Sequence, residues 1–369
     1  MLLKQKFLGR SQRIDLIATQ NTIPSLETAK EATVEATNQS QTNYYPELRR
    51  IIKEQGLLDK QRAYYTFKII STLALLGLSI TLLVVVNNFW LQLANAALLA
   101  LVFGQIGFVG HDAGHRSVLR AVRGNDLIGL SGSFLMGLSW SWWVTQHNQH
   151  HTTPNDLEQD PHTTIPFLAF SEETAQSRSK RMRSILRYQA FYFVPMLLLE
   201  GRNVRLASIL FWVGQGKSKV LMYEPLSMGL HFLLYFGLLL YFLNPWQVLA
   251  FVLVHQALFG LYYGVVFAPN HKGMLTIDKN NPMDFLHTQV LTTRNVKPGL
   301  ITDFWYGGLN HQIEHHLFPM MPRNNLGKAR KIIKRFCQEH DISYYETSTS
   351  RSYWEILSYL HRVAAPVRG

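Results

Sequence analysis

The sequence predicts an all-α membrane protein, in which four transmembrane helices form two hairpins beneath a cytosolic helical cap. Two pairs of uncharged apolar segments support this prediction, because each segment is about long enough to cross a bilayer. The break within each pair lacks Lys and Arg, whereas the outer flanks are basic, as is typical of cytoplasmic flanks. Three short windows rich in histidine lie outside these segments.

The chain begins with a polar stretch. Residues 1–45 are rich in Thr, Gln, Glu and Ser, and we expect a mobile N-terminal tail, because such a composition cannot bury a core. Its first part, residues 1–18, could lie on a membrane surface or be simply a tail, and it lacks the apolar core of a secretory signal. Residues 46–340 are predicted to form the membrane domain, and residues 341–369 a cytosolic C-terminal tail.

The two hairpins follow a predicted helix over residues 45–68. The spans of the first hairpin cover about residues 69–86 and 89–109. Those of the second cover about residues 227–243 and 248–267, with Asn244-Pro245-Trp246 between them. The basic flanks predict that the N- and C-termini are both cytoplasmic.

The segment between the hairpins is less regular. Residues 127–146 are uncharged and of span length, but a crossing there would place the first two histidine windows on opposite sides of the membrane. We therefore expect an interfacial or re-entrant segment with its Trp residues near headgroup depth. Residues 152–219 are polar and basic with apolar islands, one of them interrupted by Pro195, and are predicted to form part of the cap.

Composition limits the partners. The net charge of +12, from 36 basic and 24 acidic residues, favours acidic partners such as anionic headgroups, a phosphate-bearing substrate or an acidic protein. Nucleic acid fits poorly with a chain this apolar. Cys337 is the only cysteine, which excludes an intramolecular disulfide and Cys-ligated iron–sulfur or zinc sites. Residues 324–340 are predicted to form a basic helix, either a solvated face or a docking surface.

The histidine windows predict a metal site. The first has His111 and His115, the second His147, His150 and His151, and the third Gln312, His315 and His316, so the windows hold seven of the 15 His. Residues three and four apart share one face of a helix, so each window aims its imidazoles at one point. Seven imidazoles exceed what one ion uses, and imidazole suits Fe, Zn, Cu and Ni, so we expect two metal ions.

Other residues near the windows complete this prediction. His271 follows the fourth span as His111 follows the second, and is a further candidate ligand. His231 and His255 are isolated within spans and are weaker candidates. The nearest carboxylates, which balance charge or orient imidazoles, are those of Asp112, Asp156, Asp160 and Glu314. A site at the membrane surface suits a substrate with an apolar tail, and the sequence offers no acid or base for an unactivated C–H bond, so the metals and O2 must supply the chemistry.

The three windows resemble the histidine boxes of integral-membrane fatty acid desaturases. The pattern is His111-x3-His115, His147-x2-His150-His151 and Gln312-x2-His315-His316, and the resemblance runs from about Arg49 to Cys337. Gln at the first position of the third box is similar to front-end and related acyl-lipid or acyl-CoA desaturases.

The resemblance implies a non-haem di-iron centre and an O2-dependent reaction that forms a cis double bond in a fatty acyl chain. Iron would be bound by the seven box histidines His111, His115, His147, His150, His151, His315 and His316, with His271 as an extra ligand. Gln312, Asp112, Asn270, Asp160 and Glu314 would lie near the metals or around their ligands. Trp140 and Trp143 would wall an acyl tunnel or anchor the interface, and Arg294 would bind a headgroup or brace the cap.

The electron source is expected to be a separate protein. Eukaryotic front-end members commonly carry a fused cytochrome domain with a His-Pro-Gly-Gly motif, which this sequence lacks. An external ferredoxin, or a cytochrome with its reductase, would then supply electrons, and the basic surface suits an acidic donor. Two alternatives stay open: a membrane di-iron acyl hydroxylase, and a non-catalytic membrane metal carrier.

Overall fold

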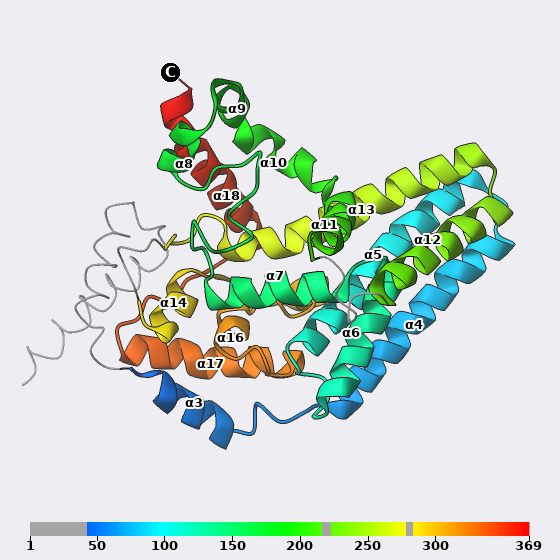
Figure 1. The fold of residues 1–369 in the computed structure, drawn as a ribbon. Coiled ribbons are helices and arrows are strands. Elements are labelled where there is room, and N and C mark those ends of the chain that lie inside the picture. The colour runs from blue at the N-terminus through cyan, green and yellow to red at the C-terminus, as the bar shows by residue number, and fades with distance from the viewer. Residues whose placement is uncertain (1–42, 216–222, 278–282, 369) are drawn as a thin grey trace, which may run out of the picture.

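The computed structural model describes residues 43–215, 223–277 and 283–368. The predicted tail therefore lies outside the described residues as far as position 42. Within these described ranges, four helices are long and apolar enough to cross a membrane: α4 (Arg62–Val85), α5 (Phe89–Gly114), α12 (Tyr223–Phe242) and α13 (Pro245–His271). They form two hairpins that project to the right of Figure 1. The predicted fold class, an all-α membrane protein with four spans, is confirmed.

The turns of both hairpins are built from capping side chains. Asn88 accepts from the backbone N–H of Leu91 at the start of α5, and Gln92 donates to the last carbonyls of α4. Asn244 and Gln247 form a reciprocal capping box at the start of α13. At their other ends α5 and α13 run past the predicted span limits, so that His111 and His271 still lie on helices.

Two predicted segments are divided in the structure. The helix expected over residues 45–68 is wrong as a single element: α3 (Tyr45–Glu54) ends before a loop in which Leu57 is buried, and α4 begins at Arg62. Residues 127–146 form parts of α6 (Val122–Met136) and α7 (Trp140–Thr152). Gly137, with φ of 69°, ends α6 in the left-handed conformation that glycine adopts most easily. Neither helix has span length.

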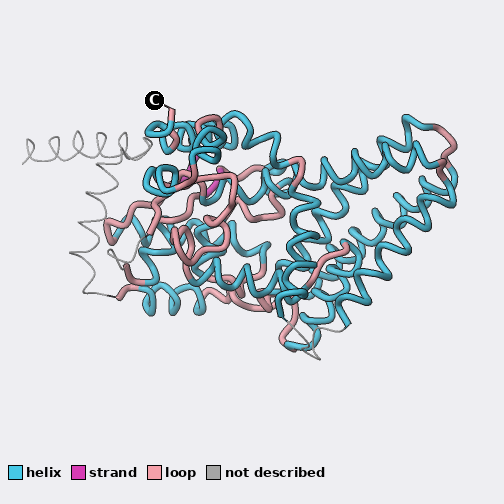
Figure 2. Tube along the Cα trace, turned by 45° about the horizontal axis from the view of Figure 1, so that its top comes forward, coloured by secondary structure: helices cyan, strands magenta, loops and turns pink. Residues whose placement is uncertain are grey.

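The cap consists of short helices around the inner ends of the spans (Figure 2). Its elements are α8 (Glu172–Ser177), α9 (Lys180–Leu186), α10 (Gln189–Leu197), α11 (Glu200–Gln215), α14 (Phe285–Leu291), α15 (Leu300–Trp305), α16 (Gln312–Leu317), α17 (Arg323–Glu339), α18 (Thr349–Val363) and the 3-10 helix η2 (Ala365–Val367). Strands β1 (Asn295–Val296) and β2 (Glu346–Thr347) pair in parallel. The segment predicted as a C-terminal tail is folded as far as residue 368, with Ile356 and Leu360 fully buried.

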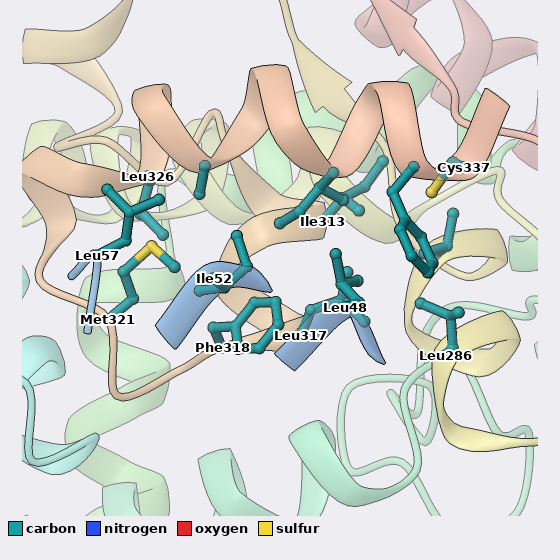
Figure 3. Close-up of a cluster of buried hydrophobic side chains, with 14 of the residues drawn as sticks. Leu48, Ile52, Leu57, Leu286, Ile313, Leu317, Phe318, Met321, Leu326 and Cys337 are labelled. Carbon is teal, nitrogen blue, oxygen red and sulfur yellow. The ribbon is translucent and has the colours of Figure 1, made fainter. Parts of the chain in front are cut away.

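A hydrophobic core holds α16 in place. Ile313 and Leu317, one turn apart on α16, are fully buried between α3 and α17 (Figure 3). Leu48 and Ile52 of α3 belong to the same cluster. Because Ile313 and Leu317 face this core, the histidines between them face the opposite way, toward the spans.

The crossing of α13 with the α10–α11 corner requires a glycine. A Cβ at Gly260 would lie 2.6 Å from the Gly201 nitrogen and 2.8 Å from the Leu197 carbonyl oxygen. We expect Gly260→Ala to lower stability by about 1–3 kcal/mol, because two backbones must separate. Gly237→Ala on α12 is the matched control, because no atom lies within 4 Å of a Cβ added there. Thermal unfolding in one detergent measures both, and equal melting temperatures for the two variants would contradict this account.

Candidate metal centre

Eight histidines from four helices converge where the spans meet the cap. They come from the end of α5 (His111 and His115), from α7 (His147, His150 and His151), from the end of α13 (His271) and from α16 (His315 and His316). All except His151, which is half-buried, are buried. The structure thus brings together every histidine that the sequence singled out as a strong candidate. His231 and His255 belong to no metal-capable group among the described residues.

Five of these histidines form a first group: His111, His115, His147, His151 and His315, whose ligand atoms all lie within 4.8 Å of one another. The Nε2 of His147 lies 2.8 Å from that of His115 and 3.2 Å from that of His151. Two imidazoles at right angles around one ion, with bonds of about 2.1 Å, have their nitrogens about 3.0 Å apart. The spacing is therefore that of ligands sharing an ion.

The second group is smaller. His150, His271 and His316 also have ligand atoms within 4.8 Å of one another, and Nε2 of His150 lies 3.2 Å from Nε2 of His271. The Gln312 amide lies 3.1 Å from the same His271 nitrogen, where a histidine box would place another imidazole. Asn270 donates to Gln312 Oε1 and so fixes this amide. The two groups adjoin, since the rings of His151 and His316 stack with centroids 4.1 Å apart.

Partners on the far side of the rings set their orientation. Asp160 Oδ2 lies 2.9 Å from His150 Nδ1, and Gln289 Oε1 lies 2.9 Å from His316 Nδ1. Each acceptor holds the proton on Nδ1, so that Nε2 keeps a lone pair that can bind a metal ion. Nε2 of both His111 and His316 is buried without a hydrogen-bond partner in the described part of the chain. Buried nitrogens of this kind fit a metal ion, so the residues present suit two transition-metal ions.

Five of the imidazoles favour the neutral form that a metal ligand requires. Burial, followed by repulsion between neighbouring rings, holds the pKa of His115, His147, His151, His315 and His316 well below the ordinary value. Burial alone would raise the pKa of the Asp160 carboxyl, but His150 beside it holds that pKa below its usual range.

The other carboxylates take different positions. Asp112 pairs with Arg323 at 2.6 Å and lies 3.3 Å from His111 Nδ1. Glu314 turns away from the rings and accepts from Asn295 and from Tyr344, while burial raises its pKa to about 7. Asp156 caps a backbone turn by accepting from two N–H groups, of Glu158 and Gln159.

Arg294 is a brace in the structure. Its side chain is 1% exposed; it donates to the backbone carbonyls of Pro269 and Lys272, on either side of His271 and Asn270, and it pairs with Glu355 at 2.9 Å. This arrangement holds the end of α13 against α18.

The tryptophans lie beside the first group. Trp140 and Trp143 line a cavity of about 40 Å³ with His111 at one end, and Trp143 stacks on the His147 ring. The other lining residues are mostly apolar and come from α5, α6 and α13. The cavity thus places apolar side chains next to the metal-capable His111.

Several residues of the site were not assigned a role from the sequence. Gln289 contacts His316, and Arg323 pairs with Asp112 next to His111. His162 forms a third metal-capable group with His150 and Asp160. The position of His162, close to the second histidine window in the sequence, could have identified it as a candidate ligand. No spacing rule connects Gln289 or Arg323 to the boxes.

His311, one place before the third box, gives a pH test. Burial lowers its pKa to about 4, although nearby Asp303 raises it. The unfolded state therefore takes up the proton first, and stability falls as pH drops from about 6.5 to about 4, by about 3 kcal/mol in all. We expect His311→Gln to remove this loss of stability. The variant should therefore become more stable relative to the wild type as the pH falls. Paired unfolding measurements from pH 7.5 to 5 test this, and a constant difference between the proteins would contradict it.

Fold and site together define a helical membrane protein with a histidine-rich site suited to metal ions. A model of the family described as fatty acid desaturase matches residues 88–348. The chain is 30% identical over 334 residues to an acyl-lipid (9-3)-desaturase of Physcomitrium patens, covering 87% of this chain and 62% of that protein. It is 32% identical over 326 residues to a Delta(6)-fatty-acid desaturase of Caenorhabditis elegans, covering 81% and 70%. A Delta(8)-fatty-acid desaturase of Euglena gracilis is 30% identical over 339 residues, covering 87% and 78%.

The chain belongs to the fatty acid desaturase family. The family and the enzyme class predicted from the histidine boxes are thereby confirmed.

Proposed function

We propose that this protein is an O2-dependent membrane desaturase that introduces a cis double bond into a fatty acyl chain, using two non-haem irons. The observation that carries the proposal is a pair of adjoining histidine groups, one member of which, His111, lines an apolar cavity. Five imidazoles would hold one iron, and His150, His271 and His316, with Gln312 nearby, would hold the other. Bound iron would supply the oxidising chemistry together with O2.

The residues of the chain position the substrate and the ligands. Trp140 and Trp143 wall the cavity beside His111, so that an acyl chain lies against the first histidine group. Asp160 and Gln289 fix the rings of the second group. The substrate is an acyl-lipid or acyl-CoA. One of the relatives is named as an acyl-lipid desaturase, and two are named as fatty-acid desaturases.

An external ferredoxin, or a cytochrome with its reductase, would supply electrons from the cytosolic side, on which we also place both termini. Lys328, Lys331 and Arg335 are exposed on α17 and are spaced to share one face of that helix. Such a face attracts an acidic partner, and salt would weaken this attraction.

The alternatives differ in product. A membrane di-iron hydroxylase would use the same site and release a hydroxy acid. A metal carrier would place histidines along a path through the spans, whereas here the metal-capable groups lie at span ends. The site disfavours the carrier, and membership of the fatty acid desaturase family favours desaturation over hydroxylation.

The test is expression in a host that makes saturated and monounsaturated lipids, with total fatty acids analysed by gas chromatography–mass spectrometry. A new unsaturated acid, absent from the empty host, is expected, and its derivative locates the bond. A new hydroxy acid would instead support the hydroxylase and overturn the proposal.

A further inference from the structure

The short helix α15 presents an apolar face that the rest of the described chain leaves exposed. The face consists of Leu300, Ile301, Phe304 and Trp305. Leu300 and Ile301 are 94% and 84% exposed. With about 100° of rotation per residue, the four apolar side chains fall on one side of the helix, and Thr302 and Asp303 fall on the other. A contiguous apolar patch of this kind marks an interaction surface.

The polar side of α15 is bound to the protein, so the helix has a fixed orientation. Asp303 Oδ1 accepts from the Asn310 side chain at 2.7 Å and lies 3.5 Å from the backbone nitrogen of Gly299. The Tyr262 hydroxyl of α13 donates to the Trp305 carbonyl at 2.9 Å, and the two rings contact with centroids 4.5 Å apart. The apolar face therefore points outward from a helix that is held by α13 and by the loop before α16.

Helices α5 and α13 place α15 at one edge of the membrane. A Cβ at Gly307, just after α15, would collide with the Phe108 ring of α5. From Phe89 at the start of α5 to Phe108, the helix rises about 28 Å, and from Pro245 at the start of α13 to Tyr262 it rises about 26 Å. The hydrocarbon core of a bilayer is about 30 Å thick. Measured from the hairpin turns, both helices thus reach the opposite edge of the hydrocarbon at α15.

The apolar face also continues a lipid-facing stripe of α5. The stripe has positions three and four residues apart, namely Leu91, Ala94, Leu98, Leu101, Gln105 and Phe108. Along it the first two side chains are exposed, the next two are half-buried and the last two are buried. Gln105 is covered by Tyr262, to whose hydroxyl it donates at 3.0 Å, and Trp305 packs on the same tyrosine. Helix α15 therefore lies where the exposed part of the stripe ends.

The ends of α15 carry side chains that suit the headgroup layer. Lys297 is exposed and precedes Leu300 by three residues, and Trp305 is the last residue of the helix. Lysine and tryptophan are typical of the boundary between hydrocarbon and water. Asp303 is the only charged residue of α15, and it lies on the side that is bonded to the protein. The surroundings of the face thus match a lipid leaflet.

We propose that α15 inserts its apolar face into the bilayer leaflet beside the histidine groups, with Lys297 and Trp305 among the headgroups, and so anchors the cap to the membrane. The partner of this surface is lipid. The inference requires neither bound metal nor turnover, and it goes beyond the proposed desaturase function. Residues 306–311, which lead from α15 to the third histidine window, would then be tied to the membrane surface.

The depth of a single introduced thiol tests the proposal. The native Cys337 is fully buried, so the wild type should take up little label and serves as the blank. Ile301→Cys is spin-labelled and placed in phosphatidylcholine vesicles without other protein. Leu233→Cys, at a position that is 70% exposed on the spanning helix α12, is the control for lipid, and Lys331→Cys, on the exposed side of α17, is the control for water. Collisions with O2, which concentrates in hydrocarbon, are compared with collisions with a water-soluble nickel chelate.

The ratio of oxygen to chelate collisions at Ile301→Cys is expected to exceed that at Lys331→Cys roughly tenfold, because the apolar face of an interfacial helix lies about 5–10 Å into the boundary between headgroups and acyl chains. It should approach the ratio at Leu233→Cys. Equal ratios at Ile301→Cys and Lys331→Cys, with a high ratio at Leu233→Cys, would place the face in water and overturn the inference.

Thr302→Cys, on the polar side of the same helix, tests the orientation of α15. Its ratio of oxygen to chelate collisions is expected to be lower than that of Ile301→Cys, since the two side chains differ by about 100° around the helix axis. Equal ratios at the two positions would mean that α15 does not insert one face, and would contradict the proposal even if both labels were shielded from the chelate.

Discussion

The double variant His315→Ala, His316→Ala is expected to abolish product formation, by at least about 100-fold. His315 belongs to the first histidine group and His316 to the second, so this variant would remove one ligand from each of the two proposed irons. Loss of a residue that only orients a ligand already costs about 10–100-fold in metal affinity or activity, and loss of the ligands themselves should exceed that. Product per amount of membrane protein, measured by gas chromatography–mass spectrometry, checks the result.

His361→Ala is the matched control, because this imidazole is exposed on α18, away from the site. It should retain wild-type product. Substantial product from the double variant, at equal protein level, would mean that α16 does not supply ligands to the reacting centre.

Asp160→Asn is expected to lower iron affinity and activity about 10–100-fold with the fold intact. Asp160 is fully buried and accepts from His150 Nδ1 and from the Asn155 backbone. An amide has nearly the same shape but removes the negative charge that holds the proton on Nδ1 and makes Nε2 a better ligand. Competition for iron with a graded series of chelators measures the affinity.

The exposed Asp59→Asn provides the control for the same change of charge. It should bind iron as the wild type does. Equal iron affinity in the Asp160 and Asp59 variants would show that His150 needs no carboxylate partner, and that the second group does not depend on this contact.

The sequence was sufficient to predict the features that repeat along the chain. The spans follow from uncharged apolar length, and the grouping of the histidines, His111 and His316 among them, follows from spacings of three and four residues on helices. Even His271, which stands alone in the sequence, was placed by analogy between the two hairpins.

The rest depends on contacts between distant segments. Gln289 reaches His316 from α14, and Arg323 reaches Asp112 from α17, although 27 residues separate the first pair along the chain and more separate the second. The division of residues 127–146 at Gly137 depends on how α6 packs against α5 and α12 and how α7 packs against α11, which composition does not encode. Arg294 shows the same limit, because its burial and its ion pair with Glu355 of α18 join segments that are distant in the sequence.

The central claim is that two adjoining histidine groups hold two irons, and metal content tests it most directly. Protein purified from iron-supplemented cells in a form that makes product should contain about two irons per chain by elemental analysis, and Mössbauer spectra should show a coupled pair. Active protein with one iron per chain, or with another metal in both groups, would contradict the account.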